Sequence, residues 1–238
     1  MVWGFNICFR INAYFQQQSY FMSNVTVIVI GGTGATGKQL VAQLLENHAV
    51  NLVKVFVRKE VTLSHDKLQS VVVDFDAIDT WQHLITGDML FSAMGTTLKQ
   101  AGSKDEQYKV DVTYPYQVAK AAATNGVPVA VLLSAYGAKA NSSIFYSKIK
   151  GELETLFIAL PFLRLHIFQP GILERLANDG RVFENIALKL IKWVNAFGLF
   201  SSQTPMPVPV LADKMIKAAF NNTANKLTYY RLNGIFSV

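Results

Sequence analysis

The sequence predicts an α/β fold in which helices cover both faces of a doubly wound, mainly parallel sheet. Short runs of β-branched and other apolar residues recur along the chain, each long enough for a strand that is buried on both faces. Segments with apolar residues at helical spacing alternate with these runs, as in repeated strand–helix units. The third observation is a glycine-rich turn at residues 31–37, which joins a first strand at 25–30 to a helical pattern at 38–46.

The glycine-rich turn predicts a dinucleotide site of the Rossmann type. Gly31 permits the turn, Gly34 lets the backbone approach a pyrophosphate, and Gly37 lets the helix pack close to the strand. The start of the helix then holds anionic oxygens with its backbone N–H groups. The intervening residues that we expect at the cofactor are Thr33, Ala35 and Thr36. A glycine-rich turn without a ligand is the alternative that this pattern leaves open.

The residues after the turn argue against ATP hydrolysis. Lys38 is followed by Gln39, so the turn lacks the hydroxyl that ligates magnesium in a phosphate-binding P-loop.

Composition limits the class of protein. With 51% hydrophobic residues among 238, the chain is long enough for one large core, and we expect residues 22–238 to form a single domain. The formal net charge is +6, but Lys and Arg are scattered among acids, so we expect no nucleic-acid partner. No Cys or His cluster has metal-ligand spacing, and no run reaches the roughly eighteen apolar residues of a membrane span. The lone Cys8 suits a reducing compartment, and we expect the cytoplasm.

The first 21 residues stand apart from the rest of the chain. Asn6, Arg10 and the glutamines at 16–18 interrupt this aromatic-rich segment, so it lacks the continuous apolar core of a signal peptide. Met22 leads straight into the first strand. We therefore interpret residues 1–21 as a misassigned start, with a genuine N-terminal extension as the alternative.

The end of the second predicted strand, at 52–57, indicates the cofactor. Arg58 and Lys59 follow it, about twenty residues after the last glycine of the turn, where the adenosine ribose is bound. An acid at this position accepts hydrogen bonds from the ribose of NAD, whereas a basic residue accommodates the 2′-phosphate of NADP. The pair favours NADP(H) over NAD(H); two solvated charges on a loop are the alternative.

The next strand ends supply further cofactor contacts. A third strand at 68–75 ends in Asp74 and Phe75, which flank the adenine or serve as a turn acid and a core aromatic. A fourth strand at 88–94 runs into small residues that we expect to form the cofactor floor, namely Gly95, Thr96 and Thr97.

The second half of the predicted sheet carries the chemistry. After a helical pattern at 104–125, a fifth strand at 128–133 ends at Ser134. The helical segment that follows carries Tyr146 and Lys150, and a spacing of four places both side chains on one helix face. A cationic lysine near a phenol favours the phenolate and lowers its pKa. We expect Tyr146 to exchange a proton with a substrate oxygen to which Ser134 hydrogen-bonds. Taken alone, such a pair on a helix is usually surface packing.

The chain resembles an atypical member of the short-chain dehydrogenase/reductase superfamily over roughly residues 25–219. The matching motifs are Gly31-x-x-Gly34-x-x-Gly37, Ser134 and Tyr146-x-x-x-Lys150. Three further stretches look most like the Tat-interacting oxidoreductase-like branch of that superfamily and its bacterial relatives: Phe91-Ser-Ala-Met-Gly-Thr-Thr97, Leu133-Ser-Ala-Tyr-Gly137 and Phe145-Tyr-Ser-Lys-Ile-Lys-Gly-Glu152.

The resemblance implies a role for each motif residue. Tyr146 is the general acid/base, Lys150 lowers its pKa and binds the nicotinamide ribose, and Ser134 orients the carbonyl. A sixth strand at 163–168 leads to Pro170 and Gly171, which in the family lie beside the nicotinamide.

Two residues depart from the family pattern. Asp111 stands where related enzymes commonly carry Asn, and Gln169 where Arg is frequent. We therefore expect proton relay and substrate binding to differ from those of related enzymes.

The predicted function is an NADP-dependent oxidoreductase that transfers hydride to or from a carbonyl or alcohol substrate. An NADPH-binding regulatory or scaffold protein without turnover is the alternative. Neither the substrate nor the oligomeric state follows from the sequence.

The remaining segments have simpler patterns. Residues 182–200 repeat apolar positions at helical spacing, and we expect the wider segment of about 172–210 to cover the substrate pocket, with core packing as the alternative. Residues 205–210 are expected to be extended, 212–219 helical, and the last dozen to add a short strand.

Overall fold

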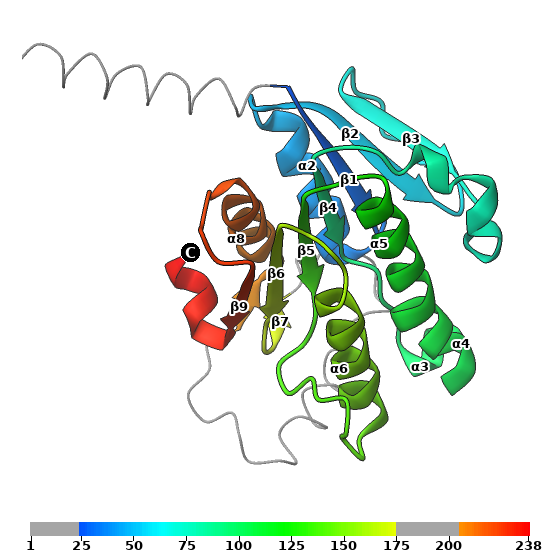
Figure 1. Ribbon diagram of the computed structural model, residues 1–238. Helices are drawn as coiled ribbons and strands as arrows, with labels where there is room; N and C mark the ends of the chain where they lie inside the picture. The colour runs from blue at the N-terminus through cyan, green and yellow to red at the C-terminus, as the bar shows by residue number, and fades with distance from the viewer. Residues whose placement is uncertain (1–23, 175–204) are drawn as a thin grey trace, which may run out of the picture.

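The computed structural model describes residues 24–174 and 205–238, and its centre is a parallel sheet of seven strands (Figure 1). The strands of this sheet are β1 (Val25–Ile30), β2 (Val50–Val57), β3 (Leu68–Val72), β4 (Met89–Ser92), β5 (Val129–Leu133), β6 (Arg164–Gln169) and β9 (Leu227–Arg231). The α-helices are α2 (Ala35–Glu46), α3 (Leu98–Ala101), α4 (Lys104–Tyr108), α5 (Tyr114–Thr124), α6 (Phe145–Ile158) and α8 (Val208–Phe220). Two short strands, β7 (Leu173–Glu174) and β8 (Met206–Pro207), pair separately.

The strand order is β3-β2-β1-β4-β5-β6-β9, so the chain winds outward from β1 in both directions. Every strand pair in this sheet is parallel. The predicted doubly wound α/β fold is therefore confirmed. The direction of winding reverses between β1 and β4, and in such sheets ligands bind beyond the carboxyl ends of the strands at that point.

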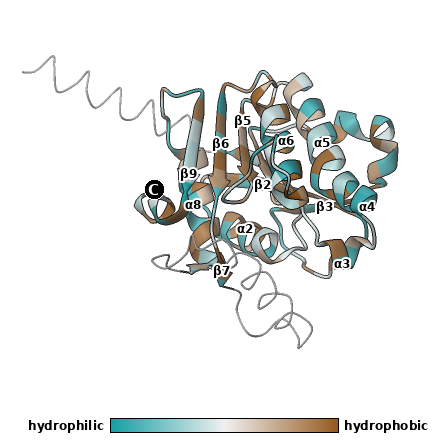
Figure 2. Ribbon diagram, turned by 90° about the horizontal axis from the view of Figure 1, so that it is seen from below, coloured by the Kyte–Doolittle hydropathy of each residue, from teal (hydrophilic) through white to brown (hydrophobic). Residues whose placement is uncertain are grey.

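Two helical layers bury the sheet because alternate side chains of each strand point to opposite faces. Val27 and Val29 of β1 pack with α2 and α8, whereas Ile28 and Ile30 pack with α5 and α6. The view along the sheet in Figure 2 shows apolar strands between the two helical layers. Both faces of the inner strands β1, β4, β5 and β6 are thus buried, as their continuous apolar runs predicted.

The ends of several predicted elements differ from the structure. The third strand stops at Val72 rather than Phe75, because Asp74 begins a 3₁₀ turn by accepting a hydrogen bond from the backbone N–H of Asp76 at 2.9 Å. The fourth strand spans only Met89–Ser92. The expected extended stretch at 205–210 is extended only to Pro207. The helix α8 begins at Val208, and Pro209 fits its first turn, where no N–H is needed. The last dozen residues do contribute a strand, β9.

The single helix expected at 104–125 is divided by one π-helical turn at Lys109–Thr113. Pro115 explains the change, because it has no N–H to donate to the carbonyl four residues earlier, that of Asp111. A wider turn at this point displaces the helix register, and such turns are frequent at functional sites.

Some predictions fall outside the described residues. These are the leader at 1–21 and the helix expected at 182–200, together with most of the substrate-covering segment. Within the described ranges, no helix is long and apolar enough to cross a membrane.

Candidate functional site

The glycine-rich turn lies between β1 and α2 and requires its glycines. Gly31 has φ +78°, and a Cβ there would lie 2.5 Å from the backbone carbon of Ala93, at the end of β4. A Cβ on Gly37 would lie 2.0 Å from the carbonyl oxygen of Gly31. Both positions therefore exclude any side chain. The turn consequently sits tightly in the crevice between β1 and β4.

The turn leaves the start of α2 open to an anion. Its own backbone bonds run from Gly34 N to Gly31 O and from Lys38 N to Gly34 O, both at 2.9 Å. No described side chain caps this end of α2, and its first turn, which includes Ala35 and buried Thr36, carries no acid. The backbone N–H groups and the helix dipole thus suit a pyrophosphate, with exposed Thr33 at the rim. These residues fit a dinucleotide cofactor.

Arg58 and Lys59 are exposed and follow β2, the strand beside β1 on the side away from β4. They are therefore available to a phosphate at the carboxyl edge. Asp74 and Phe75 lie one strand farther out. The ring of Phe75 is buried, with its centroid 5.4 Å from those of Trp81 and Tyr114, so it belongs to the core. Asp74 is thus a turn acid and Phe75 a core aromatic in the structure, and the contact of either residue with an adenine stays a prediction.

The loop after β4 adjoins the motif helix. A Cβ on Gly95 would lie 3.2 Å from Asp111 Oδ1 and 3.4 Å from Lys150 Nζ, so this glycine opens space directly above that pair. The backbone N–H of Thr96 donates to Asp111 Oδ2 at 2.8 Å. Thr97 caps α3 by accepting from the backbone N–H of Gln100. The expected cofactor floor and Lys150 therefore meet at one point of the carboxyl edge.

Lys150 forms a buried ion pair with Asp111. The Nζ–Oδ1 distance is 2.7 Å, and the two side chains are 5% and 1% exposed. Desolvation is the largest influence on the pKa of Lys150 and lowers it, but the surrounding groups together outweigh it, chief among them the charge of Asp111, and the pKa lies above its usual value. Lys150 is therefore held as a cation.

Tyr146 lies one helical turn before Lys150. The distance from Lys150 Nζ to the centre of the Tyr146 ring is 5.8 Å. Burial raises the pKa of the Tyr146 phenol, and the opposing effect of Lys150 does not compensate for it, partly because Asp111 also raises this pKa. The sequence-based expectation of a lowered pKa is therefore wrong for this state of the protein. A phenol that keeps its proton is suited to donate it.

Ser134 lies at the carboxyl end of β5, where its side chain is buried and donates a short hydrogen bond to Glu154. Glu154 is on α6, one turn beyond Lys150. Gln169 donates from Nε2 to both carboxylate oxygens of Glu154, at 2.8 and 3.0 Å. Arg231 of β9 donates in turn to Gln169 Oε1 at 2.7 Å. These four residues form what we call the polar chain.

Two members of the polar chain, Glu154 and Arg231, were not expected at the site from the sequence. Glu154 continues the Tyr146–Lys150 spacing by another four residues, so helix periodicity alone would have placed it on the same face. Arg231 carries no such signal, because only the pairing of β6 with β9 brings it opposite Gln169.

The turn after β6 closes the site from the other side. The carbonyl of Pro170 accepts from the backbone N–H of Tyr136 at 3.0 Å, which ties this turn to the loop after Ser134. Gly171 follows at the same edge. His166, in the middle of β6, is fully buried and its pKa is lowered to about 4, chiefly by desolvation, so it remains a neutral core residue.

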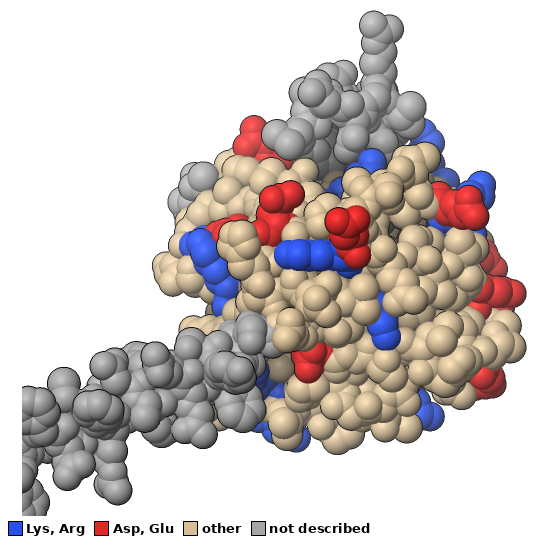
Figure 3. Space-filling model, turned by 90° about the horizontal axis from the view of Figure 1, so that it is seen from above, with Lys and Arg blue, Asp and Glu red and all other residues tan. Residues whose placement is uncertain are grey.

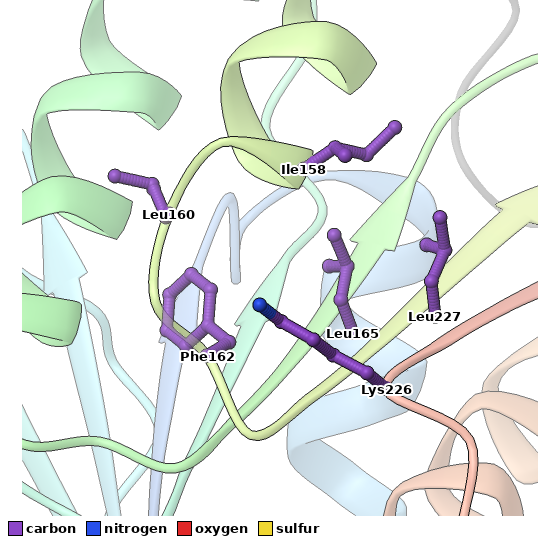
Figure 4. A pocket seen from close by; sticks show the side chains of 6 residues that line it. All are labelled: Ile158, Leu160, Phe162, Leu165, Lys226 and Leu227. Atoms are coloured by element: carbon purple, nitrogen blue, oxygen red, sulfur yellow. The ribbon is translucent and has the colours of Figure 1, made fainter.

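A small apolar cavity of about 190 Å³ lies elsewhere, at the amino ends of β6 and β9 (Figure 4). Its lining includes Phe162, Leu165 and Lys226, and it lies at the opposite end of the sheet from Ser134 and Lys150. The face seen in Figure 3 shows acidic and basic side chains intermixed rather than gathered in one patch of a single sign. Among the described residues, no three His, Cys, Asp or Glu side chains gather as a metal site would require.

The fold and the glycine turn at its switch point define a dinucleotide-binding protein of the Rossmann class. Comparison with known proteins agrees. The chain belongs to the NAD(P)H-binding family, which it matches over residues 31–156.

The chain is also similar to curated proteins over most of its length. The chain is 33% identical to the mitochondrial protein FMP52 of Eremothecium gossypii, over 82% of this chain and 87% of that protein. It is 30% identical to protein HTATIP2 of Rattus norvegicus, over 87% of this chain and 84% of that protein. The sequence-based recognition is therefore confirmed.

Solved structures at low identity agree on the fold. A short-chain dehydrogenase from Burkholderia cenocepacia in complex with NADP superposes with a TM-score of 0.60 at 15% identity, over 87% of this chain and 88% of that one. MoeE5 in complex with UDP-glucose and NAD superposes with a TM-score of 0.65 at 15% identity, over 87% of this chain and 75% of that one.

The relatives correct one expectation. Several FMP52 proteins that the chain resembles are named as mitochondrial, which points to mitochondria and contradicts the expected cytoplasmic location. The reasoning failed because a lone cysteine indicates only a chain without internal disulfides, and more than one compartment suits such a chain.

Proposed function

We propose that this protein is an NADP(H)-dependent oxidoreductase that reduces a carbonyl group of a small-molecule substrate. The observation that carries the proposal is the close approach of Lys150 Nζ to the backbone of Gly95, in the loop after β4. It brings the Tyr146–Lys150 face of α6 to the same edge as the glycine turn between β1 and β4. A dinucleotide that follows this edge from its pyrophosphate reaches Lys150 with its other end.

A bound reduced nicotinamide supplies the hydride to the carbonyl carbon. Tyr146 then gives its phenolic proton to the oxygen, and Lys150 stabilises the resulting phenolate by its charge. The raised pKa of Tyr146 favours this direction, because the residue enters the reaction protonated. Asp111 keeps Lys150 charged and in place.

The preference for NADP(H) rests on Arg58 and Lys59. Both are exposed at the end of β2, and Arg58 has a planar group that binds a phosphate with two parallel hydrogen bonds. Arg58, Lys59 and the turn residues form the adenosine half of the site, whereas Thr97, Pro170 and Gly171 adjoin the nicotinamide half.

A regulatory or scaffold protein that binds NADPH without turnover is the second candidate. It is favoured by the internal contacts of the motif, since Lys150 is paired with Asp111 and Ser134 with Glu154. The two candidates differ in whether Tyr146 has a proton-transfer role.

The deciding experiment compares the wild type with Tyr146→Phe. NADPH binding is followed by fluorescence, and NADPH oxidation is followed with a panel of aldehydes, ketones and quinones. We expect equal affinity and a loss of turnover of at least about a hundredfold, because phenylalanine keeps the ring but lacks the proton. Tight NADPH binding without oxidation of NADPH by any member of the panel would favour the second candidate.

A further inference from the structure

The hydroxyl of Ser134 has one proton, and in the structure this proton is directed to Glu154. A serine hydroxyl donates one hydrogen bond and accepts up to two. While it donates to Glu154, Ser134 offers a ligand only lone pairs. A carbonyl oxygen also offers only lone pairs, so the two do not bond in this arrangement. Orientation of a carbonyl by Ser134 therefore needs a change elsewhere.

Glu154 is the group that receives this proton, and its surroundings are unusual for a carboxylate. Its side chain is buried, and the described groups within hydrogen-bonding distance are the neutral side chains of Ser134 and Gln169. Arg231 reaches it only through the amide of Gln169.

The charged and titratable groups that face Glu154 are few. Lys150 approaches from α6 but is paired with Asp111, and Arg231 and Tyr229 approach from β9. Burial raises the pKa of Glu154, and the hydrogen bonds from Gln169 and Ser134 and the distant cations offset this only in part. The surroundings thus tolerate the neutral acid.

We infer that the protonation state of Glu154 sets whether Ser134 donates a hydrogen bond to the substrate or accepts one from it. Neutral Glu154 carries its own proton and donates it to Ser134 Oγ, which frees the serine proton for a carbonyl oxygen. Ionised Glu154 accepts a hydrogen bond from the hydroxyl of Ser134. The serine Oγ can then only accept a hydrogen bond, and it does so from the O–H of an alcohol. No bond to carbon changes, and no proton leaves the pair during turnover.

The inference rests on the proposed function and assigns Glu154 as a positioning residue, since it acts through Ser134. According to this inference, the rate of carbonyl reduction falls as Glu154 ionises, because Ser134 no longer donates to the carbonyl oxygen. Tyr146 remains the proton donor at every pH. Glu154→Gln fixes the first state permanently, because the amide donates to Ser134 at every pH while its oxygen accepts from Gln169. Glu152→Gln is the matched control, because it removes the same charge from the same helix at a partly exposed position that pairs with Lys148.

The first arm of the test needs no substrate. Infrared spectra of the full chain are recorded against pH, and the protonated-carboxyl band that is absent in Glu154→Gln is titrated. Ser134→Ala should move the midpoint of this band to higher pH, because the hydrogen bond from Ser134 lowers the pKa of Glu154 and therefore stabilises the anion more than the neutral acid. The control Glu152→Gln should leave the midpoint in place. A band whose midpoint is the same in Ser134→Ala and the wild type would overturn the inference.

The second arm measures kcat/KM for NADPH-dependent reduction of phenanthrenequinone. We expect the wild type and Glu152→Gln to lose about tenfold per pH unit above the infrared midpoint. Glu154→Gln should stay at the wild type's low-pH value through that range. The same pH-dependent fall in Glu154→Gln, or inactivity of a folded Glu154→Gln at every pH, would overturn the inference. If no carbonyl compound is reduced while the infrared arm succeeds, the proposed function fails, and the coupling of Glu154 to Ser134 stands on its own measurement.

Discussion

Replacing Asp111 with Asn should destabilise the fold by about 3 to 5 kcal/mol, because it leaves the ammonium of Lys150 buried without a counter-charge. The pair is separated by 2.7 Å, with exposures of 5% and 1%, so water does not replace the lost partner. Asparagine keeps an oxygen that accepts from the backbone N–H of Thr96, and the substitution therefore changes the charge with little loss of volume. Relief comes by lowering the pKa of Lys150, because desolvation, the largest influence on it, then acts without the charge of Asp111 to oppose it.

The assay is urea unfolding at neutral pH, with Asp213→Asn as the control. Asp213 pairs with Lys217 on α8 at a similar distance of 2.8 Å, but both side chains are about half exposed. Its loss should change the free energy of unfolding by less than about 1 kcal/mol. The reasoning is refuted if the two variants lose the same small amount, because burial would then have no effect on the cost of removing the acid.

Two further predictions test the cofactor site and the core. Arg58→Ala should weaken NADPH binding roughly ten- to a hundredfold and leave NADH binding nearly unchanged in fluorescence titrations; equal losses for both cofactors would argue against a phosphate contact. His166→Phe should remove an acid-dependent loss of stability. The folded protein keeps His166 neutral to a pKa of about 4 whereas the unfolded chain binds a proton near 6.5, so the wild type should lose about 2 to 3 kcal/mol more than the variant as pH falls between these values. Parallel denaturation curves of the two proteins across this pH range would contradict it.

Local patterns were enough to predict most of the fold. The apolar runs identified six strands of the sheet, and the short strand expected in the last dozen residues is β9. Inner strands such as β4 and β5 are buried on both faces, so their apolar pattern is visible in the local sequence alone. Gly31 and Gly37 were identifiable for a related reason: a missing side chain is the only way to fit the close backbone contacts at a tight turn. The ends of elements were less predictable, as at Asp74, where one side-chain hydrogen bond ends the extended chain early.

The chemistry of the site was predictable only in part. Spacing placed Tyr146 and Lys150 on one helix face, but their pKa values depend on Asp111, which a π-helical turn from another segment brings against Lys150. The burial of Tyr146 and the charge of Asp111 near it arise only when distant segments pack together. They raise the pKa of Tyr146, whereas the sequence led us to expect a lowered pKa. The helix expected through Asp111 would not have revealed this contact.

The polar chain suggests how the departure at Gln169 is compensated. The family resemblance leads us to expect Arg there, and the structure instead has a neutral amide against Glu154 with Arg231 behind it, contributed by β9. The cation is therefore present but one residue farther from the carboxylate. This arrangement weakens the attraction that would keep Glu154 ionised.

Exchanging the two residues, Gln169→Arg with Arg231→Gln, should return the cation to direct contact with Glu154 without changing the total charge. A guanidinium beside a buried carboxylate lowers its pKa, so the infrared midpoint of Glu154 should move to lower pH by at least about one unit. Ser134 would then remain a donor to Glu154, and quinone reduction at neutral pH should fall towards the value that the wild type shows at high pH. Arg231→Gln alone is the control, because it removes the distant cation and should move the midpoint in the opposite direction. A midpoint in the exchanged protein that equals or exceeds that of the wild type would show that the distance of the cation from Glu154 does not control its ionisation.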